Sequence, residues 1–250
     1  MAHADLHFHL LPGVDDGPAD MEASLELARA AVADGTGTIV VTPHARADLG
    51  VTDPVEIHAR VMELRYALEG ADIPLELRCG AELGHELVGR MRQSELELIA
   101  QGPSGARWVL VETPFEGIGG DFREATAELR ERGFGVLVAH PERSADASLD
   151  GAAGLRAELA AGSLAQLNAL SLTGGHGEEA CSAAWELVAE GLVAVIASDA
   201  HGPTRPPALQ RARRTLVEVG VSGAVALSLV GSGPHRLLTA GFESPRAVAA

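Results

Sequence analysis

A strand-then-helix pattern repeated seven times constrains the fold of this chain more than any other feature of its sequence. Each unit begins with a short run that is apolar at most positions, followed by a turn and an amphipathic stretch. Such runs are typical of strands covered on both faces, as in parallel sheets. The seven predicted strands are residues 5–9, 38–44, 76–83, 108–114, 135–143, 164–172 and 193–201.

Helix start and stop signals occupy the segments between these runs. Asp53 and Pro54 suit the cap and the first position of a helix, and glycine at position 35 suits the residue after one. The apolar stripe of the helix at 20–34 is predicted to be Met21, Leu25, Ala28 and Val32, and that of the next is Ile57, Val61, Leu64 and Leu68. Helices are predicted over residues 20–34, 53–70, 121–133, 148–161, 176–190, 205–219, 222–230 and 234–240.

No linker or change of composition interrupts these units, so residues 1–250 are predicted to form a single domain. A length of 250 residues is normal for one α/β barrel. Strand–helix units in unbroken succession favour a closed or nearly closed parallel barrel. An open, doubly wound sheet is the competing architecture.

Ionisable side chains gather where the predicted strands end, which is the end of a barrel that carries active sites. A lone histidine or glutamate there is usually a hydrogen-bonded structural residue. Five of the ten histidines lie at these ends, however, and burying so many ionisable groups on one rim is costly unless cations compensate them. The candidate metal ligands are His7, His9, Asp16, His44, Glu82, Glu112, His140, Asp199 and His201.

Nine ligands are too many for one ion, so two or three divalent ions are predicted. A mixed imidazole and carboxylate shell without thiolates suits Mn²⁺, Zn²⁺ or iron better than Ca²⁺. Asp5 either orients an imidazole or is a surface residue at the start of its strand, and Asp15 has no evident role. Cys79 and Cys181 fit no metal or redox spacing and are expected to be buried thiols.

Two arginines follow candidate ligands closely in loops on the same rim. Arg143 comes three residues after His140, and Arg205 four residues after His201. Guanidinium groups bind phosphate oxygens in a bidentate way and stabilise charge that develops during phosphoryl transfer. The alternative for Arg143 is a local ion pair with Glu142 or Asp146.

The net charge of −16, with 19 basic residues that are all arginine, disfavours a nucleic-acid partner. No apolar run reaches the roughly 18 residues of a membrane-spanning helix, so membrane insertion is not expected. The N-terminus lacks a basic region followed by an apolar one, which predicts a cytoplasmic protein. The sequence does not determine the oligomeric state.

Eight short motifs, taken together, resemble the PHP (polymerase and histidinol phosphatase) superfamily. Within it they look most like the bacterial CpsB-type tyrosine phosphatases of capsular and exopolysaccharide synthesis, and the resemblance runs in order from residue 5 to about residue 240. The motifs are Asp-x-His-x-His (5–9), Leu-Pro-Gly-Val-Asp-Asp-Gly (11–17), Thr-Pro-His (42–44), Gly-Ala-Glu (80–82), Val-Glu-Thr-Pro (111–114), His-Pro-Glu-Arg (140–143), Gln-Leu-Asn-Ala-Leu-Ser-Leu (166–172) and Ala-Ser-Asp-Ala-His (197–201).

The resemblance implies a distorted (β/α)7 barrel with a trinuclear metal centre, usually loaded with Mn²⁺. It implies that His7, His9, Glu112 and Asp199 hold one ion, and that Glu112 bridges to a second ion bound with His140. Asp16, His44, Glu82 and His201 would serve the second and third ions, with Glu82 as the other bridge. Arg143 and Arg205 match the arginines that bind the substrate phosphate. The loop of residues 201–205 is one residue shorter than usual, and residues 45–51 match no family motif.

The expected reaction is hydrolysis of a phosphate monoester by attack of a metal-bound hydroxide on phosphorus. A tyrosine-phosphorylated protein, such as a bacterial tyrosine kinase, is the expected substrate, since a phenolic leaving group with a pKa near ~10 needs little protonation. A Cys-x5-Arg loop is absent, which disfavours a cysteine phosphoenzyme. The alternatives are a phosphatase of a small metabolite such as histidinol phosphate, a metal-dependent exonuclease, and a non-catalytic metal-binding barrel.

Overall fold

A computed structural model describes residues 2–51, 53–147 and 152–242, and its strands match the predicted runs. Two of the seven runs are divided: 38–44 becomes β2 and β3, and 76–83 becomes β4 and β5. Pro43 lies at the first division and has no N–H to donate to a ladder. The strands are β1 (His3–Phe8), β2 (Thr36–Val41), β3 (His44–Ala45), β4 (Glu76–Cys79), β5 (Glu82–Leu83), β6 (Trp108–Glu112), β7 (Gly135–Ala139), β8 (Leu164–Asn168) and β9 (Val193–Ala197).

All strand pairs are parallel, and the ring of strands closes on itself. One sheet has the order β1-β2-β4 and the other β3-β5-β6-β7-β8-β9. The divided strands stay paired across their breaks, because Gly80 N–H donates to Val41 O over 2.9 Å. The last strand meets the first where His9 N–H donates to Ala200 O over 3.0 Å. The predicted closed barrel is confirmed, and the open sheet is excluded.

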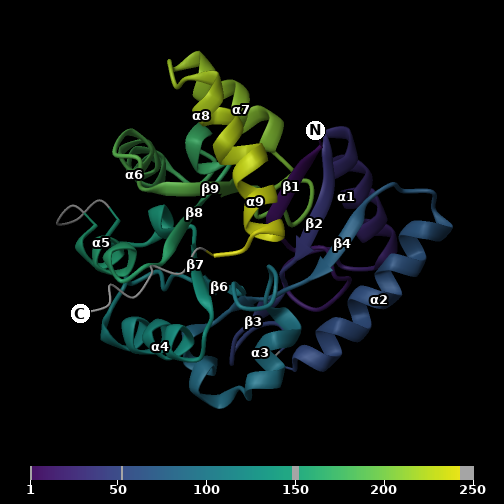
Figure 1. Cartoon of the computed structure of the whole chain (residues 1–250). Coiled ribbons are helices and arrows are strands. Elements are labelled where there is room, and N and C mark those ends of the chain that lie inside the picture. Colours follow the sequence, from purple (N-terminus) through teal and green to yellow (C-terminus); the bar gives the residue numbers. More distant parts are fainter. Residues whose placement is uncertain (1, 52, 148–151, 243–250) are drawn as a thin grey trace.

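The helices lie around the outside of the strands (Figure 1). The structure adds α3 and a 3₁₀ turn at His85–Arg90, which the sequence analysis did not predict, while residues 148–151 of the helix predicted at 148–161 lie outside the described residues. No helix in the described ranges is long and apolar enough to cross a membrane. The helices are α1 (Met21–Ala33), α2 (Pro54–Gly70), α3 (Gln93–Ile99), α4 (Gly120–Glu131), α5 (Ala153–Ala160), α6 (Glu178–Ala189), α7 (Leu209–Glu218), α8 (Gly223–Leu227) and α9 (Gly233–Thr239).

The predicted apolar stripes hold fully for α2 and only partly for α1. All four stripe residues of α2 are buried, and Asp53 caps the helix by accepting from Val55 N–H. In α1 the buried face is instead formed by small residues, Ser24, Ala28 and Ala31, together with Leu27. Small side chains let a helix approach its neighbours closely, so the larger Met21 and Leu25 lie at the edge of the contact and are partly buried.

The barrel interior is apolar at the end where the strands begin. Side chains of β1, β6, β7 and β9, including Leu6 and Trp108, form a core cluster with Leu237 and Leu238 of α9. Trp108 Nε1–H donates to Leu237 O over 3.0 Å, which fixes this last helix across the barrel. The C-terminal helix therefore seals the amino end of the barrel, and the polar side chains collect at the carboxyl end.

The two cysteines are free thiols, and both are only partly buried. Burial raises the pKa of the Cys79 thiol to about 11. The prediction of free thiols rather than a disulfide holds, but neither side chain is fully buried.

Asp5 joins the first and last strands of the barrel. Its Oδ1 accepts from Ser198 N–H over 3.1 Å and its Oδ2 from the Ser198 hydroxyl over 2.5 Å. Complete burial raises the pKa of Asp5 to about 6, although the two bonds from Ser198 oppose the shift. Asp5 thus neither orients an imidazole nor lies at the surface, because its carboxyl group is used to close the barrel.

Substitution Asp5→Ala is expected to lower the free energy of unfolding by about 2 kcal/mol, because it leaves the buried Ser198 N–H and hydroxyl without partners. Denaturant titration of the purified protein measures the change. The matched control is Glu63→Ala on the exposed face of α2, which should shift stability by less than about 0.5 kcal/mol. An equal effect of both substitutions would contradict the closing role of Asp5.

Candidate metal centre

A break in strand register directs His7, near the end of β1, and His9, just after it, into the mouth of the barrel. Pairing between β1 and β2 shifts between Asp5 and Phe8. As a result Leu6 packs in the interior cluster, while the next residue, His7, also turns inward. Register breaks of this kind re-aim side chains and are common beside active sites. The Nε2 atoms of His7 and His9 lie 3.2 Å apart, as the alternation of the strand predicted.

Four side chains from three separate segments of the chain lie close together at the barrel mouth. Glu82 Oε2 lies 3.3 Å from the Nε2 atoms of both His7 and His9. Asp199 Oδ1 lies 3.3 Å and 3.4 Å from the same two nitrogens. The donor atoms of His7, His9 and Glu82 lie close enough together to hold a divalent ion, and so do those of His7, His140 and Asp199.

The division of ligands that the resemblance implied differs from this geometry. The resemblance grouped Glu112 with His7, His9 and Asp199. In the structure, the carboxylate beside His7 and His9 is that of Glu82. Glu112 instead lies with its Oε2 3.7 Å from His44 Nδ1. The cause is the short β5 strand, which sets Glu82 opposite His44 and inside the barrel mouth.

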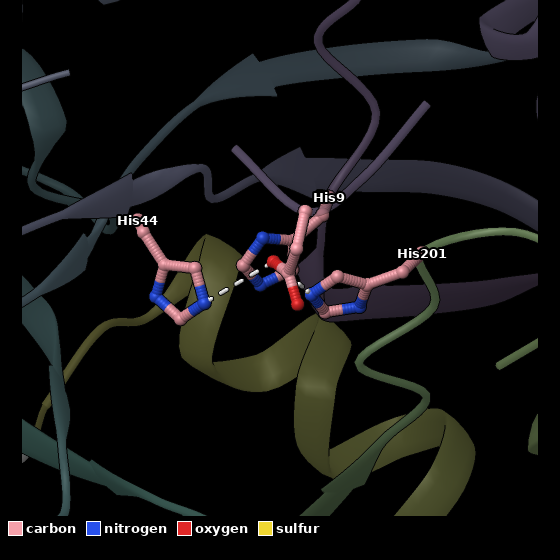
Figure 2. Close-up of side chains that lie close together, drawn as sticks. His9, His44 and His201 are labelled. Carbon is pink, nitrogen blue, oxygen red and sulfur yellow. Dashed lines mark ion pairs between the residues drawn. The ribbon is translucent and has the colours of Figure 1, made fainter. Parts of the chain in front are cut away.

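A second group of side chains forms around Asp16. Asp16 Oδ1 lies 3.1 Å from His201 Nε2 and 3.5 Å from His44 Nε2. Figure 2 shows the rings of His9, His44 and His201 turned toward one another, and the His9 and His201 rings stack with their centroids 3.7 Å apart. His9, Asp16, His44 and His201 together could hold a further ion.

A third group is centred on Glu82, whose carboxylate faces four imidazoles. Its Oε1 lies 2.7 Å from His140 Nε2, and its Oε2 lies 2.9 Å from His44 Nδ1. Since Oε2 also faces His7 and His9, Glu82 is placed to bridge neighbouring ions. Each of the nine predicted ligands therefore lies within ion-pair distance of another member of the set.

Three imidazoles are oriented by oxygen atoms behind them. His7 Nδ1 lies 2.9 Å from Gln166 Oε1, His9 Nδ1 2.8 Å from Asp15 Oδ2, and His201 Nδ1 2.8 Å from the Asp199 carbonyl oxygen. These oxygens only accept, so each Nδ1 donates and the Nε2 lone pair faces the centre, as metal-binding histidines require. Asp15, which the sequence analysis could not place, holds His9.

The pKa shifts of the clustered side chains indicate that the carboxylates lack enough positive charge around them. Burial alone would lower the pKa of His9, but the carboxylates of Asp15, Asp199 and Glu82 outweigh burial and hold that pKa well above its ordinary value. Burial likewise opposes protonation of His44, yet Glu82 and Asp16 raise its pKa to about 10. Burial and the neighbouring Glu82 raise the pKa of Glu112 to about 7. Bound cations would relieve each of these shifts.

Unpartnered buried atoms provide a test of whether ions fit this site. Glu82 Oε2, His44 Nδ1 and His201 Nε2 are buried and, within the described ranges, make no hydrogen bond of acceptable geometry. Buried polar atoms rarely remain without a partner, and these three converge on the groups described above. Divalent ions therefore fit the donor set that the chain provides.

Two members of the group adopt a backbone conformation that L-residues seldom take. His140 has a φ of 33° directly after β7, and Asp199 has a φ of 50° two residues after β9. Side chains are held in this left-handed region only where the surroundings impose it, and such strain concentrates at functional sites. The strain turns both side chains back toward the barrel axis.

Three arginines border the cavity above the centre, which has a volume of about 140 Å³. Arg143 donates to Asp199 Oδ2 over 3.0 Å rather than to Glu142 or Asp146, which excludes the local pairs considered above. Arg205 donates to Asp16 Oδ2 over 2.5 Å, so the shortened loop still brings it to the rim. Arg46, from the unmatched segment 45–51, donates to both oxygens of Glu112 over 2.9 Å and 3.1 Å.

Strand β8 supplies supporting residues that the sequence analysis overlooked or underrated. Gln166 holds His7, and Asn168 Nδ2 donates to Asp199 Oδ2 over 2.8 Å. Glu142, buried behind them, accepts from Asn168 N–H over 2.9 Å. Gln166 and Asn168 are alternate polar positions in an otherwise apolar run, and that pattern was a usable signal.

Substitution Asp15→Asn is expected to weaken binding of the divalent ions by about 10- to 100-fold, because His9 loses the carboxylate that holds its ring. Competition with a fluorescent chelator measures the affinity. Asp121→Asn, an exposed carboxylate at the start of α4, is the control and should bind as the wild type does. Unchanged affinity in Asp15→Asn would mean that the contact does not support the centre.

Sequence comparisons with known proteins all point to one family. A sequence model described as capsular polysaccharide synthesis, CpsB/CapC, matches residues 3–238. The tyrosine-protein phosphatase YwqE of Bacillus subtilis is 30% identical over 197 residues, covering 79% of this chain and 76% of that protein. The putative tyrosine-protein phosphatase CapC of Staphylococcus aureus is 29% identical and covers 81% and 78%, respectively.

Solved structures agree with these relationships. One matching chain comes from the crystal structures of YwqE from Bacillus subtilis and CpsB from Streptococcus pneumoniae, which are described as metal-dependent tyrosine phosphatases. It superimposes with a TM-score of 0.81 at 27% identity, and the match covers 97% of this chain and 97% of that one. The phosphotriesterase homology protein of Escherichia coli shares the fold, with a TM-score of 0.64 at 14% identity over 94% of this chain and 98% of that one. The chain belongs to the CpsB/CapC family of capsular polysaccharide synthesis.

Proposed function

We propose that this chain is a metal-dependent tyrosine-protein phosphatase that acts on a phosphorylated protein of capsule or exopolysaccharide synthesis. The observation that carries the proposal is the cavity in which six of the nine imidazole and carboxylate ligands meet three arginines, with His7, His9 and His201 grouped against the same side chains. Relatives that align over about three quarters or more of the chain are named tyrosine-protein phosphatases. The substrate would be a tyrosine-phosphorylated protein, for example a bacterial tyrosine kinase, encountered in the cytoplasm.

The proposed metal ligands are the nine side chains of the sequence analysis, arranged as the distances group them. Two or three divalent ions would be held, with Mn²⁺ as the first choice and Zn²⁺ or iron as alternatives. Bound divalent ions supply the Lewis acidity that hydrolysis of a phosphate ester needs. The set comprises His7, His9, Asp16, His44, Glu82, Glu112, His140, Asp199 and His201.

Arg143 and Arg205 are the proposed catalytic residues, because they bring fixed positive charge to the rim of an acidic protein. Asp199 Oδ2 lies 3.0 Å from Arg143 Nη1 and 3.9 Å from Arg205 Nη1, so one carboxylate holds both guanidinium groups beside the cavity. Their remaining N–H groups can bind the oxygens of a phosphoryl group and stabilise charge in the transition state.

A cysteine nucleophile is not part of this proposal. Among the residues that the structure describes, neither Cys79 nor Cys181 lines the cavity. The thiol of Cys79, with its pKa raised to about 11, stays protonated at neutral pH and is a poor nucleophile.

A phosphatase assay on two kinds of substrate tests the proposed function. The Mn²⁺-loaded protein is expected to hydrolyse a phosphotyrosine peptide with a higher kcat/KM than histidinol phosphate, because a phenolate leaves without a dedicated acid. A chelator is expected to abolish the activity, and Mn²⁺ should restore it better than Mg²⁺. Preference for histidinol phosphate would overturn the assignment of substrate, and full activity in chelator would overturn the role of metal.

Substitution Arg143→Ala is expected to lower kcat on the phosphotyrosine peptide by roughly 10²–10³, because the transition state loses a charged donor. Elemental analysis should show an unchanged metal content, since Arg143 contacts the centre only through Asp199 Oδ2. The control is Arg214→Ala on the exposed face of α7, which should retain wild-type kcat. Nearly intact activity in Arg143→Ala would make this arginine structural.

A further inference from the structure

A second cavity opens directly beside the metal cavity. Its volume is about 390 Å³, against about 140 Å³ for the cavity above the centre. Arg46, Glu112 and Phe115 line both, so the two cavities adjoin. Sites for small molecules usually measure roughly 300–1,000 Å³, so the metal cavity alone suits a phosphoryl group and the second cavity suits a larger attachment.

Phe115 forms the wall between these two cavities. It comes just after β6 and is 53% exposed, which is uncommon for an aromatic side chain without a partner surface. The guanidinium carbon of Arg143 lies 5.5 Å from the centre of the Phe115 ring. A phosphoryl group held by Arg143 would therefore lie close to the Phe115 ring.

The loop that carries Phe115 is fastened to the loop that carries Arg143. Ala145 N–H donates to Phe115 O over 2.7 Å, and Ile118 N–H donates to Asp146 Oδ2 over 3.1 Å. Asp146 also accepts from the Ser144 hydroxyl over 2.7 Å. These bonds fix the distance between the aromatic ring and the guanidinium group before any substrate arrives, as a preorganised subsite requires.

We propose that Phe115 is the specificity-determining residue that binds the aromatic ring of the substrate's phosphotyrosine in the second cavity. The inference rests on the proposed function and refines it, because it names the residue that selects aryl over alkyl phosphates. A tyrosyl ring that extends from the metal cavity toward the second cavity can stack on the Phe115 ring or meet its edge. The carbon chain of phosphoserine is too short to make this contact.

Calorimetric titration with two non-hydrolysable probes tests the subsite without relying on turnover. Phenylphosphonate and methylphosphonate share the phosphonate group and differ in the ring. The Mn²⁺-loaded wild type is expected to bind phenylphosphonate more tightly. In Phe115→Ala, the affinity for phenylphosphonate should fall by about tenfold and the affinity for methylphosphonate by less than about twofold. Phe115→Trp, which keeps an aromatic wall, should retain the preference for the phenyl probe.

Tyr66→Ala, which removes a 70% exposed aromatic side chain on α2, is the matched control and should bind both probes as the wild type does. Equal losses for both probes in Phe115→Ala would show that the ring acts through Arg143, and unchanged binding would show that it contacts neither probe. Either result overturns the aryl subsite. If the wild type prefers phenylphosphonate but fails to hydrolyse the phosphotyrosine peptide, the proposed function fails while the subsite stands.

Discussion

The buried carboxylate of Glu82 is the group on which the arrangement of the metal centre depends. Its two oxygens face His7, His9, His44 and His140, which come from three different parts of the barrel. A fully buried carboxylate is stable only with positive charge around it, and the imidazoles or bound cations must provide it. The same requirement accounts for the raised pKa of His44 and of Glu112.

Apolar packing and ionisable side chains occupy opposite ends of the barrel. At the amino end, α9 and Trp108 complete an apolar interior cluster, and a larger apolar cluster packs the helices against the strands. At the carboxyl end, the same strands present the ionisable side chains. Strained residues such as His140 can persist, because the apolar packing of the barrel offsets the free-energy cost of their backbone conformation.

The sequence was sufficient to predict the seven strands and to bring nine ionisable residues to one rim, because both follow from periodicity and from the direction of parallel strands. It could not predict which carboxylate joins which imidazoles, since that depends on the break between β4 and β5 and on the reach of Glu82. Asp15 was missed because it lies in a loop whose course the sequence does not show, and Gln166 was missed because its partner His7 lies 159 positions away. Arg46 and Phe115 were missed because loops carry no period.

Closure of the barrel through Asp5 and Ser198 has a consequence for how the protein folds during its synthesis. The first and last strands are joined by residues 193 positions apart, and the carboxylate of Asp199 faces the imidazoles of His7 and His9. A chain emerging from the ribosome therefore carries its histidine pair long before the opposing carboxylate is made. Contacts so distant in sequence form late in folding, so the nascent chain completes this set of side chains only after Asp199 has been made.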